Sequence, residues 1–437
     1  MNNTKITLQK KPKYIKFSED EDFFELFQKI NSVVDTCYFL ESLDADGDKS
    51  RYSVIGFEPE TLIRGDQNFK YADLSKIMPE GVISEDYAGG LVGYLGFDAF
   101  AEFEPKVKIK SHPHFDKFLF GVYTDGLVYD KTTGESYYFY YKKNRLKFIE
   151  KISKNSLPKE KKLRVVQKGA TMTKNQHKIS VKEVKKLIKE GKIFQCVVGF
   201  KEEYEIIGEA LEIYKKLRKI NPSPHMYYLK FGKQKLIGAS PELLFRLKDG
   251  TMETYPLAGT VKRGKNASED RKFARDLLSD QKELAEHRML VDLHRNDIGR
   301  IARFNTVRVN KLMDVKKFSH VQHISSEISG MLKPGIDMFS AVASNFPAGT
   351  LTGAPKIEAI KILEKIEKVP RGPYGGAVGH FGFNGNCTFT IPIRSLFISG
   401  KYGFIQAGSG IVADSEAEKE YDEVRQKLKA MDEALAI

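Results

Sequence analysis

One stretch of the chain, residues 280–300, constrains the fold most, because its apolar and acidic residues recur at helical spacing throughout. It reads DQKELAEHRMLVDLHRNDIGR. At 3.6 residues per turn, adjoining parts of one face carry Glu283, Glu286, His287 and Leu290, and an apolar side carries Leu284, Met289 and Val291. We therefore expect one amphipathic helix here.

The acids of this helix allow two interpretations. Two carboxylates three residues apart beside a histidine could hold a divalent metal ion. Lys282 and Glu286, however, form an i,i+4 pair of the kind that is common on solvated helix faces. The stretch alone leaves both interpretations open.

The composition indicates a soluble globular protein, with 41% hydrophobic and 30% charged residues among 437. No apolar run approaches the ~18 residues of a membrane span, and the N-terminal residues MNNTKITLQKKPKYIKF lack the apolar core of a signal peptide. We therefore expect a cytoplasmic protein. Cys37, Cys196 and Cys387 stand far apart without a CxxC spacing, so buried free thiols are expected rather than a zinc site or disulfides.

The net charge raises the alternative of a nucleic-acid-binding protein. The chain carries 71 Lys and Arg against 58 Asp and Glu, a formal charge of +13. The basic residues are mixed with acids rather than gathered into a stripe, and no helix-turn-helix, zinc-finger or RNP signature is present. We therefore rank this alternative second and expect no nucleic-acid partner.

Three regions follow one another along the chain. We predict a mixed α/β region at 1–141, a basic connecting segment at 142–178 and a region at 179–437 in which helices and antiparallel strands form separate runs. Such runs indicate an α+β fold of packed sheets flanked by helices.

Local signals predict several turns and helix starts. Asp125-Gly126 and Gly134 are expected to link antiparallel strands, as is Asp249-Gly250. Ser180 with Glu183 three residues on is a capping-box pattern that predicts a helix start, and Ser415 with Glu418 predicts another.

Four features of the third region are suited to small anionic ligands. The loop FPAGTLTGAPK leads into a helix N-terminus, and Gly408 and Gly410 end a strand where backbone N–H groups can approach a ligand closely. Arg394 ends the apolar strand FTIPIR and could clamp a carboxylate. Glu420 and Glu423 repeat the acid spacing of residues 280–300, so two facing helices could hold a hard cation such as Mg²⁺. Structural turns and solvated acids are the alternative for each.

Nine segments between residues 180 and 430 share their order and spacing with one family. They are IKEGKIFQCVV, NPSPHMYYL, IGASPELLFR, YPLAGT, DQKELAEHRMLVDLHRNDIGRI, FPAGTLTGAPK, RGPYGGAVG, IQAGSGIVADS and EAEKEYDE. Together they resemble the chorismate-utilising enzymes, most closely the large subunits (component I) of anthranilate synthases. FLES, SRYSVIG and GGLVGYLGFDAF extend a weaker match toward the N-terminus. The resemblance implies a large α/β sandwich of two antiparallel β-sheets flanked by helices.

The resemblance also implies how the substrate chorismate would be anchored. Mg²⁺ would bind the ring carboxylate and would be held by Glu286 and Glu423, with Glu283 and Glu420 beside them. The enolpyruvyl carboxylate would be bound by Tyr374, Arg394 and the backbone of Gly408, Ser409 and Gly410.

Three catalytic roles follow from the same resemblance. Glu242, in SPEL, would be the general acid that protonates the departing 4-hydroxyl, which requires a carboxyl kept protonated by a dry site. Thr350 would line the ring with Gly259 and Thr260, and His323 would assist the loss of pyruvate.

Two positions favour ammonia as the nucleophile. Relatives that add water to chorismate place a lysine base where this chain has Gln195, and aminodeoxychorismate synthases commonly use a lysine nucleophile where it has Ala258. Formation of anthranilate and pyruvate is therefore expected. Aminodeoxychorismate synthase component I remains the alternative within the family.

The resemblance implies a partner and an inhibitor. No cysteine has a glutaminase setting, so ammonia would come from a glutamine amidotransferase subunit (component II) in a heterodimer or heterotetramer. Feedback inhibition by tryptophan is also implied. The inhibitor site would be formed by Glu41, Ser42, Lys49, Pro224, His225 and Met226.

Overall fold

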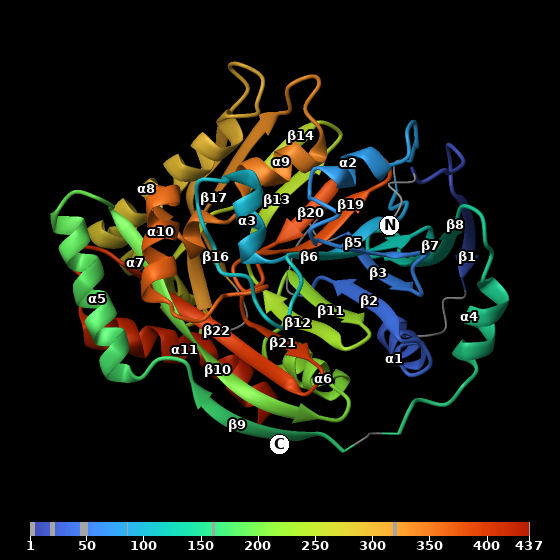
Figure 1. The fold of residues 1–437 in the computed structure, drawn as a ribbon, viewed down its shortest axis with the longest axis horizontal. Coiled ribbons are helices and arrows are strands. Elements are labelled where there is room, and N and C mark those ends of the chain that lie inside the picture. The colour runs from blue at the N-terminus through green and yellow to red at the C-terminus, as the bar shows by residue number, and fades with distance from the viewer. Residues whose placement is uncertain are drawn as a thin grey trace.

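The computed structural model of the chain describes residues 5–17, 22–43, 51–84, 86–159, 162–317 and 321–436. Two large antiparallel sheets pack face to face, with helices on the outside (Figure 1). The predicted α+β class and the sandwich of two sheets are thus confirmed. Within these residues no helix is both long and apolar enough to cross a membrane.

The first sheet has twelve strands in the described part of the chain, all antiparallel to their neighbours. In spatial order they are β1 (Lys13–Phe17), β8 (Glu135–Tyr140), β7 (Asp125–Asp130), β3 (Tyr52–Phe57), β2 (Thr36–Glu41), β11 (His225–Phe231), β12 (Gln234–Ser240), β21 (Ser395–Ser399), β22 (Tyr402–Ile411), β10 (Gln195–Ile207) and β18 (Gly353–Ala354), with β9 (Arg164–Ala170) paired to β10.

The second sheet has ten strands in the same described ranges. In spatial order they are β15 (Leu257–Lys262), β17 (Val321–Met331), β14 (Thr251–Thr254), β13 (Leu243–Lys248), β20 (Cys387–Thr390), β19 (Ala377–Gly382), β5 (Gly90–Leu95), β6 (Phe118–Tyr123) and β4 (Leu62–Arg64), with β16 (Arg308–Lys317) paired to β17. Both sheets therefore combine strands from the two ends of the chain.

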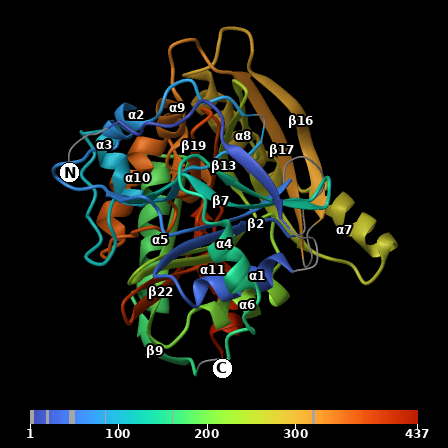
Figure 2. The ribbon, with the colours of Figure 1, turned by 90° about the vertical axis from the view of Figure 1, so that its right-hand side faces the viewer.

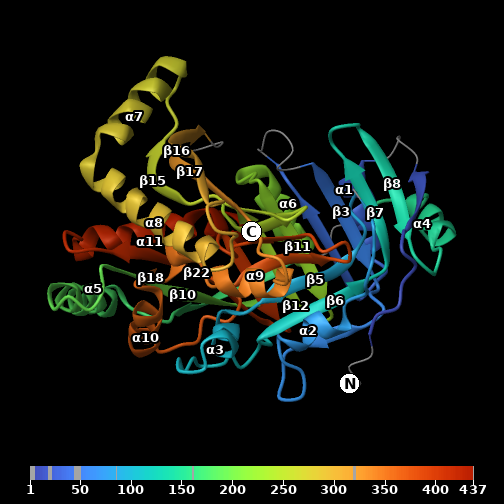
Figure 3. The same cartoon turned by 90° about the horizontal axis from the view of Figure 1, so that it is seen from above.

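The helices cover the outer faces. They are α1 (Phe23–Asn31), α2 (Asp73–Ile77), α3 (Phe100–Phe103), α4 (Leu146–Ser153), α5 (Lys174–Lys189), α6 (Leu211–Ile220), α7 (Ala267–Ser279), α8 (Gln281–Gly299), α9 (Met338–Asn345), α10 (Lys356–Ile366) and α11 (Ala417–Leu435), with short 3₁₀ turns at η2 (Phe97–Ala99) and η3 (Gly349–Leu351). Figures 1 and 3 place α5, α8, α10 and α11 at one end of the sandwich and α1 and α4 at the other. Helix α7 projects from the body (Figures 2 and 3).

The main core fills the space between the sheets. Tyr227, Phe397 and Phe404 of the first sheet belong to the same buried cluster as Phe120 and Phe381 of the second. Each fully buried aromatic or aliphatic side chain of this kind contributes about 2–3 kcal/mol to the stability of the fold. A second cluster joins the first sheet to α1, α4, α6 and α11.

One predicted turn is wrong because a distant contact overrides the local signal. Asp125-Gly126 does not link a hairpin: β6 belongs to the second sheet and β7 to the first. The Asp125 carboxylate is buried against the Arg145 guanidinium and the Tyr138 hydroxyl. The strands around Gly134 and Asp249-Gly250 pair as predicted.

The helix starts also differ from the predicted ones. Helix α5 begins at Lys174, where Thr173 and Gln176 form a capping box, so Ser180 lies buried inside the helix rather than at its start. Helix α11 follows Glu416, and the Ser415 hydroxyl accepts a hydrogen bond from Val412 N instead of capping the helix. The basic segment 142–178 contains α4, β9 and the first turn of α5. The division of the chain into regions 1–141, 142–178 and 179–437 stays a prediction.

Candidate active site

Helix α8 presents its acids toward the end of the first sheet. The helix starts at the predicted place, because the Asp280 side chain accepts hydrogen bonds from the backbone N–H groups of Lys282 and Glu283. It packs on β15 and β17. His287 is buried and its Nε2 lies 2.7 Å from Ser326 Oγ, so this histidine belongs to the helix–sheet contact. Of the polar residues predicted on this face, Glu283 and Glu286 are therefore the ones that can serve the candidate active site.

The four predicted metal ligands, two on α8 and two on α11, lie near enough for their charges to interact. Burial, together with the nearby Glu283 and Glu423 carboxylates, raises the pKa of Glu286 to about 7. Burial also raises the pKa values of Glu283 and Glu420. Like charges held this close favour either a proton or a cation between them.

The carboxylates are the type of ligand that a hard cation prefers, although their positions do not form a complete metal site. In the described ranges, no three acidic, histidine or cysteine side chains lie close enough together to hold a metal ion. Oε2 of Glu420 is buried without a hydrogen-bond partner in the same ranges. Carboxylate oxygens are the donors that Mg²⁺ prefers, and Mg²⁺ usually completes its shell with water and substrate oxygens.

Lys427 and Gln195 connect these acids to the sheet. Lys427 Nζ lies 2.7 Å from a Glu423 carboxylate oxygen and donates to the Gly408 carbonyl at 2.9 Å. Gln195 Nε2 donates to Glu286 Oε1 at 2.9 Å, and a Cβ at Gly410 would collide with this amide. The i,i+4 spacing from Glu423 placed Lys427 on the right face, but sequence reasoning gave it no role in the site.

Gly408, Ser409 and Gly410 lie near the end of β22, an interior strand of the first sheet that pairs with β21 and β10. Gly408 pairs with Gly199 and Gly410 with Val197 of β10. The Gly410 position also lies within contact distance of Glu286. The predicted anion-binding strand end therefore faces the acids of α8.

Glu242 has the environment of a general acid. It follows β12, is 5% exposed, and burial raises its pKa to about 7. The Thr350 hydroxyl, on η3, donates to Glu242 Oε1 at 2.9 Å and opposes this rise. The two predicted catalytic residues are therefore in direct contact.

Arg394 and Tyr374 lie near this acid. Arg394 sits before β21 with φ of +51°, and burial lowers the pKa of its guanidinium, whereas Tyr374 favours the charged form. Within the described ranges, Tyr374 is the group that favours this charge, and no carboxylate does so. Burial raises the pKa of Tyr374, so its phenol stays protonated. A buried cation of this kind can accept a substrate carboxylate.

The third catalytic candidate, His323, lies on β17 of the second sheet, where β17 pairs with β15. In the β15–β17 ladder His323 is the partner of Thr260, and its Nδ1 lies 2.8 Å from the Gly259 carbonyl. Donation from Nδ1 leaves Nε2 as the acceptor. Burial lowers the pKa of His323 to about 4, with Arg394 and Lys427 contributing, so the ring is neutral at neutral pH.

A buried arginine that we did not predict holds three site segments together. Arg371 is 4% exposed and forms a bidentate pair with Glu367. It also donates to the carbonyl of Leu351 on η3 and to that of Val197 on β10. Arg371 thus ties the segment of Tyr374 to those of Thr350 and Gln195. Only its place in RGPYGGAVG could have indicated this role.

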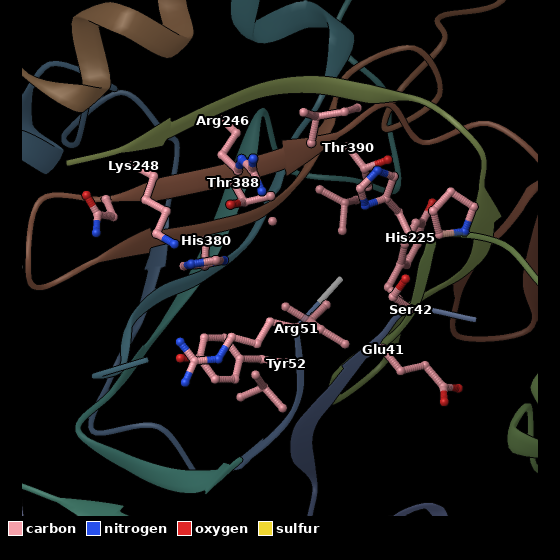
Figure 4. A pocket seen from close by; sticks show the side chains of 18 of the residues that line it. Glu41, Ser42, Arg51, Tyr52, His225, Arg246, Lys248, His380, Thr388 and Thr390 are labelled. Carbon is pink, nitrogen blue, oxygen red and sulfur yellow. The ribbon is translucent and has the colours of Figure 1, made fainter. Parts of the chain in front are cut away.

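A separate cavity of about 690 Å³ lies between the two sheets. Five of the predicted inhibitor residues line it, namely Glu41, Ser42, Pro224, His225 and Met226 (Figure 4). Lys49 lies outside the described residues. The prediction grouped these five residues without the other lining residues, many of which come from β3, β13, β16, β19 and β20.

Glu41 and Ser42 line the cavity in different ways. The Glu41 carboxylate accepts hydrogen bonds from the Arg218 guanidinium at 2.6 and 2.8 Å and from the Tyr214 hydroxyl at 2.6 Å, so it is occupied by α6. Ser42 Oγ is buried and has no hydrogen-bond partner within the described ranges. The serine hydroxyl is therefore the one available to a bound molecule.

Comparison with known proteins identifies similar chains. A model of the chorismate binding enzyme family matches residues 19–433. Anthranilate synthase component 1 of Leptospira biflexa is 49% identical over 99% of this chain and 97% of its own. The structure of anthranilate synthase component I from Streptococcus pneumoniae superposes with a TM-score of 0.77 at 31% identity, covering 89% of this chain and 93% of the other. The menaquinone-specific isochorismate synthase of Escherichia coli shares the fold, with a TM-score of 0.79 at 18% identity over 98% and 95% of the two chains.

Proposed function

The chain belongs to the chorismate binding enzyme family, and we propose that it is the subunit of an anthranilate synthase that converts chorismate and ammonia to anthranilate and pyruvate. The full-length similarity to anthranilate synthase component 1 supports this proposal. The observation that carries it is Gln195, which lies beside Glu286 and offers an amide where activation of water would require a base.

The reaction needs a general acid to protonate the 4-hydroxyl of chorismate as it leaves. Ammonia attacks C2 of chorismate, and the 4-hydroxyl leaves as Glu242 donates its proton. The pKa of about 7 keeps a large fraction of this carboxyl protonated near neutral pH. The Thr350 hydroxyl fixes the carboxyl orientation. Loss of pyruvate then forms the aromatic ring, with the neutral His323 ring as the proposed acceptor of the ring proton that is removed.

The carboxylates of chorismate would be bound at two places. Arg394, the Tyr374 hydroxyl and the strand from Gly408 to Gly410 would bind the enolpyruvyl carboxylate. Gly259 and Thr260, which contact His323, would line the ring.

Mg²⁺ is the proposed cofactor. Glu286 and Glu423 would hold it, with Glu283 and Glu420 beside them, because burial and mutual repulsion make these acids suited to a cation. When bound, the ion would neutralise the ring carboxylate. The protein's own part is to hold the acids on two helices and to orient Glu286 through Gln195.

Ammonia is proposed to come from a glutamine amidotransferase subunit, in a heterodimer or heterotetramer in the cytoplasm. All three cysteines are buried, and burial raises the pKa of Cys37 and of Cys196 to about 12 and that of Cys387 as well. Thiols with raised pKa values are poor nucleophiles. The chain's own residues therefore offer no cysteine for glutamine hydrolysis.

Tryptophan is proposed as a feedback inhibitor that occupies the 690 Å³ cavity. Met226 and Tyr227 would pack against its ring, and the Ser42 hydroxyl would bond its polar end. Titration calorimetry with tryptophan tests this assignment. The absence of binding would refute it without affecting the proposed reaction.

The decisive assay mixes the purified chain with chorismate, Mg²⁺ and ammonium salt and follows anthranilate fluorescence. We expect anthranilate from ammonium with the chain alone, and from glutamine only after the amidotransferase is added. Accumulation of 4-amino-4-deoxychorismate or isochorismate would instead assign the chain to another reaction of the family. Tight binding of random duplex DNA without chorismate turnover would favour the nucleic-acid alternative.

A further inference from the structure

The candidate active site and the cavity share a wall one residue thick. Pro241 and Leu243 line the cavity, whereas Glu242 between them belongs to the site. This alternation is what extended backbone produces, because successive side chains point to opposite sides. A molecule in the cavity would therefore contact the residues on either side of the general acid.

The backbone of Glu242 is held by a strand that also lines the cavity. The Thr390 hydroxyl donates to the Glu242 carbonyl at 2.6 Å, and Ile391 N donates to the same oxygen at 3.1 Å. Thr390 is itself a lining residue (Figure 4). Within the described ranges, its hydroxyl is the side-chain donor by which this strand of the cavity wall holds the Glu242 carbonyl, which the Ser240 hydroxyl of β12 also contacts at 3.3 Å.

The pairing at this point is irregular. Leu243 pairs with Thr390, and the register between β13 and β20 shifts between Leu243 and Phe245. A register shift leaves the ladder locally disrupted, so the backbone there is constrained by fewer ladder hydrogen bonds than in regular pairing. Glu242 immediately precedes the irregular stretch.

We propose that Thr390 is the positioning residue that couples occupancy of the cavity to the general acid: an aromatic amino acid bound there moves Leu243 and Thr390, and Glu242 leaves its position beside Thr350. This inference rests on the proposed function for the reaction and for the ligand. The coupling needs no change at Arg394 or at the acids of α8 and α11.

Thr388 provides a matched control on the same strand. It lies two residues before Thr390 on β20, and it too lines the cavity (Figure 4). Its strand partners are Arg246 and His380. Within the described ranges no hydrogen bond joins its side chain to Glu242. The two threonines therefore differ in the contact that the proposal invokes.

The test separates binding of tryptophan from inhibition by tryptophan. Titration calorimetry gives the dissociation constant, and the ammonium-dependent rate at saturating tryptophan, relative to each variant's own uninhibited rate, gives the residual activity. In the parent chain we expect inhibition of about a hundredfold, the loss that a displacement of about 1 Å at a catalytic group can cause. Thr390→Val should bind tryptophan within about threefold of the parent yet retain at least about a tenth of its own uninhibited rate.

Two further variants make the result specific. Thr390→Ser keeps the hydroxyl and should restore full inhibition, whereas Thr388→Val should leave inhibition at saturation complete even if it weakens binding. Full inhibition of Thr390→Val at saturation would overturn the proposal, as would an equal release of inhibition in Thr388→Val. A parent chain that forms anthranilate but neither binds tryptophan nor responds to it would overturn it too, whereas a parent chain that forms no anthranilate would refute the proposed function itself.

Discussion

The contact between Thr350 and Glu242 predicts a measurable shift in a pH profile. Glu242 must be protonated to donate to the leaving hydroxyl, so the rate should fall as pH rises through its pKa of about 7. The Thr350 hydroxyl donates to Glu242 Oε1 at 2.9 Å and favours the charged carboxylate. Thr350→Val removes that donor at almost constant volume, which should raise the pKa.

The size of the shift follows from the energy of the hydrogen bond. A hydrogen bond to a charged group contributes about 1.5–3 kcal/mol. The protonated carboxyl is a weaker acceptor, so only part of this energy distinguishes the two protonation states. A difference of about 1.4 kcal/mol between the two protonation states corresponds to about one pKa unit. The descending limb of the profile should therefore move from about pH 7 to about pH 8.

The assay is the initial rate of anthranilate formation between pH 6 and 9.5, at saturating chorismate and at a constant concentration of free ammonia. Thr352→Val is the matched control, because the Thr352 hydroxyl is buried on the same turn but donates to the Ala348 carbonyl. That variant should leave the limb in place. A limb that stays at its original pH in Thr350→Val, or moves downward, would refute the assignment of Glu242 as the acid.

Four further substitutions test other parts of the site. Glu242→Gln should lower the rate by at least about 100-fold. The raised pKa of Glu242 costs the folded protein stability as pH rises from the ordinary value of 4.5 through about 7, because a buried carboxyl must then lose its proton. The variant should therefore be about 3 kcal/mol more stable than the parent at pH 8 but not at pH 4, which denaturant unfolding at the two pH values would measure. Glu286→Gln should abolish Mg²⁺-dependent turnover without lowering the melting temperature, since it removes repulsion with Glu283 and Glu423, and near-normal turnover would make α8 structural. Arg371→Met leaves Glu367 buried without its partner and should lower the free energy of unfolding by about 3–5 kcal/mol in urea, and a change below about 1 kcal/mol would contradict the role of the clamp. Ser42→Ala should weaken tryptophan binding about fivefold by calorimetry and should not destabilise the fold, since it removes a buried hydroxyl without a described partner; unchanged binding would place the ligand elsewhere.

The parts of the site that follow local periodicity were predictable from the sequence. The helix with Glu283 and Glu286 depends on spacing within one segment, and its Asp280 cap lies where the sequence turns helical. The fold class followed in the same way, from separate runs of helices and antiparallel strands. The resemblance to a family then connected segments that periodicity alone leaves unrelated.

Contacts between distant segments could not be read from the sequence. Asp125 followed by glycine is typical of a hairpin turn, and only the structure shows that its carboxylate accepts a hydrogen bond from Arg145. The pairing of the Glu41 carboxylate with Arg218 of α6 likewise joins segments far apart in the sequence, and no local pattern indicates it. The link from Thr390 to Glu242 depends on the register of β13 with β20, which no local pattern specifies.

The strand order has a consequence for how this protein matures in the cell. Strand β22 (Tyr402–Ile411) lies between β21 and β10, in the interior of the first sheet, yet it is the last strand to be synthesised. Until the ribosome has passed residue 411, β10 lacks this neighbour and exposes an unpaired edge, the kind of surface that promotes aggregation. Completion of the sheet, and with it of the strand from Gly408 to Gly410, must therefore wait for nearly the whole chain. Long-range pairing of this kind folds slowly, so premature termination in the last few dozen codons should leave insoluble fragments rather than a shortened enzyme.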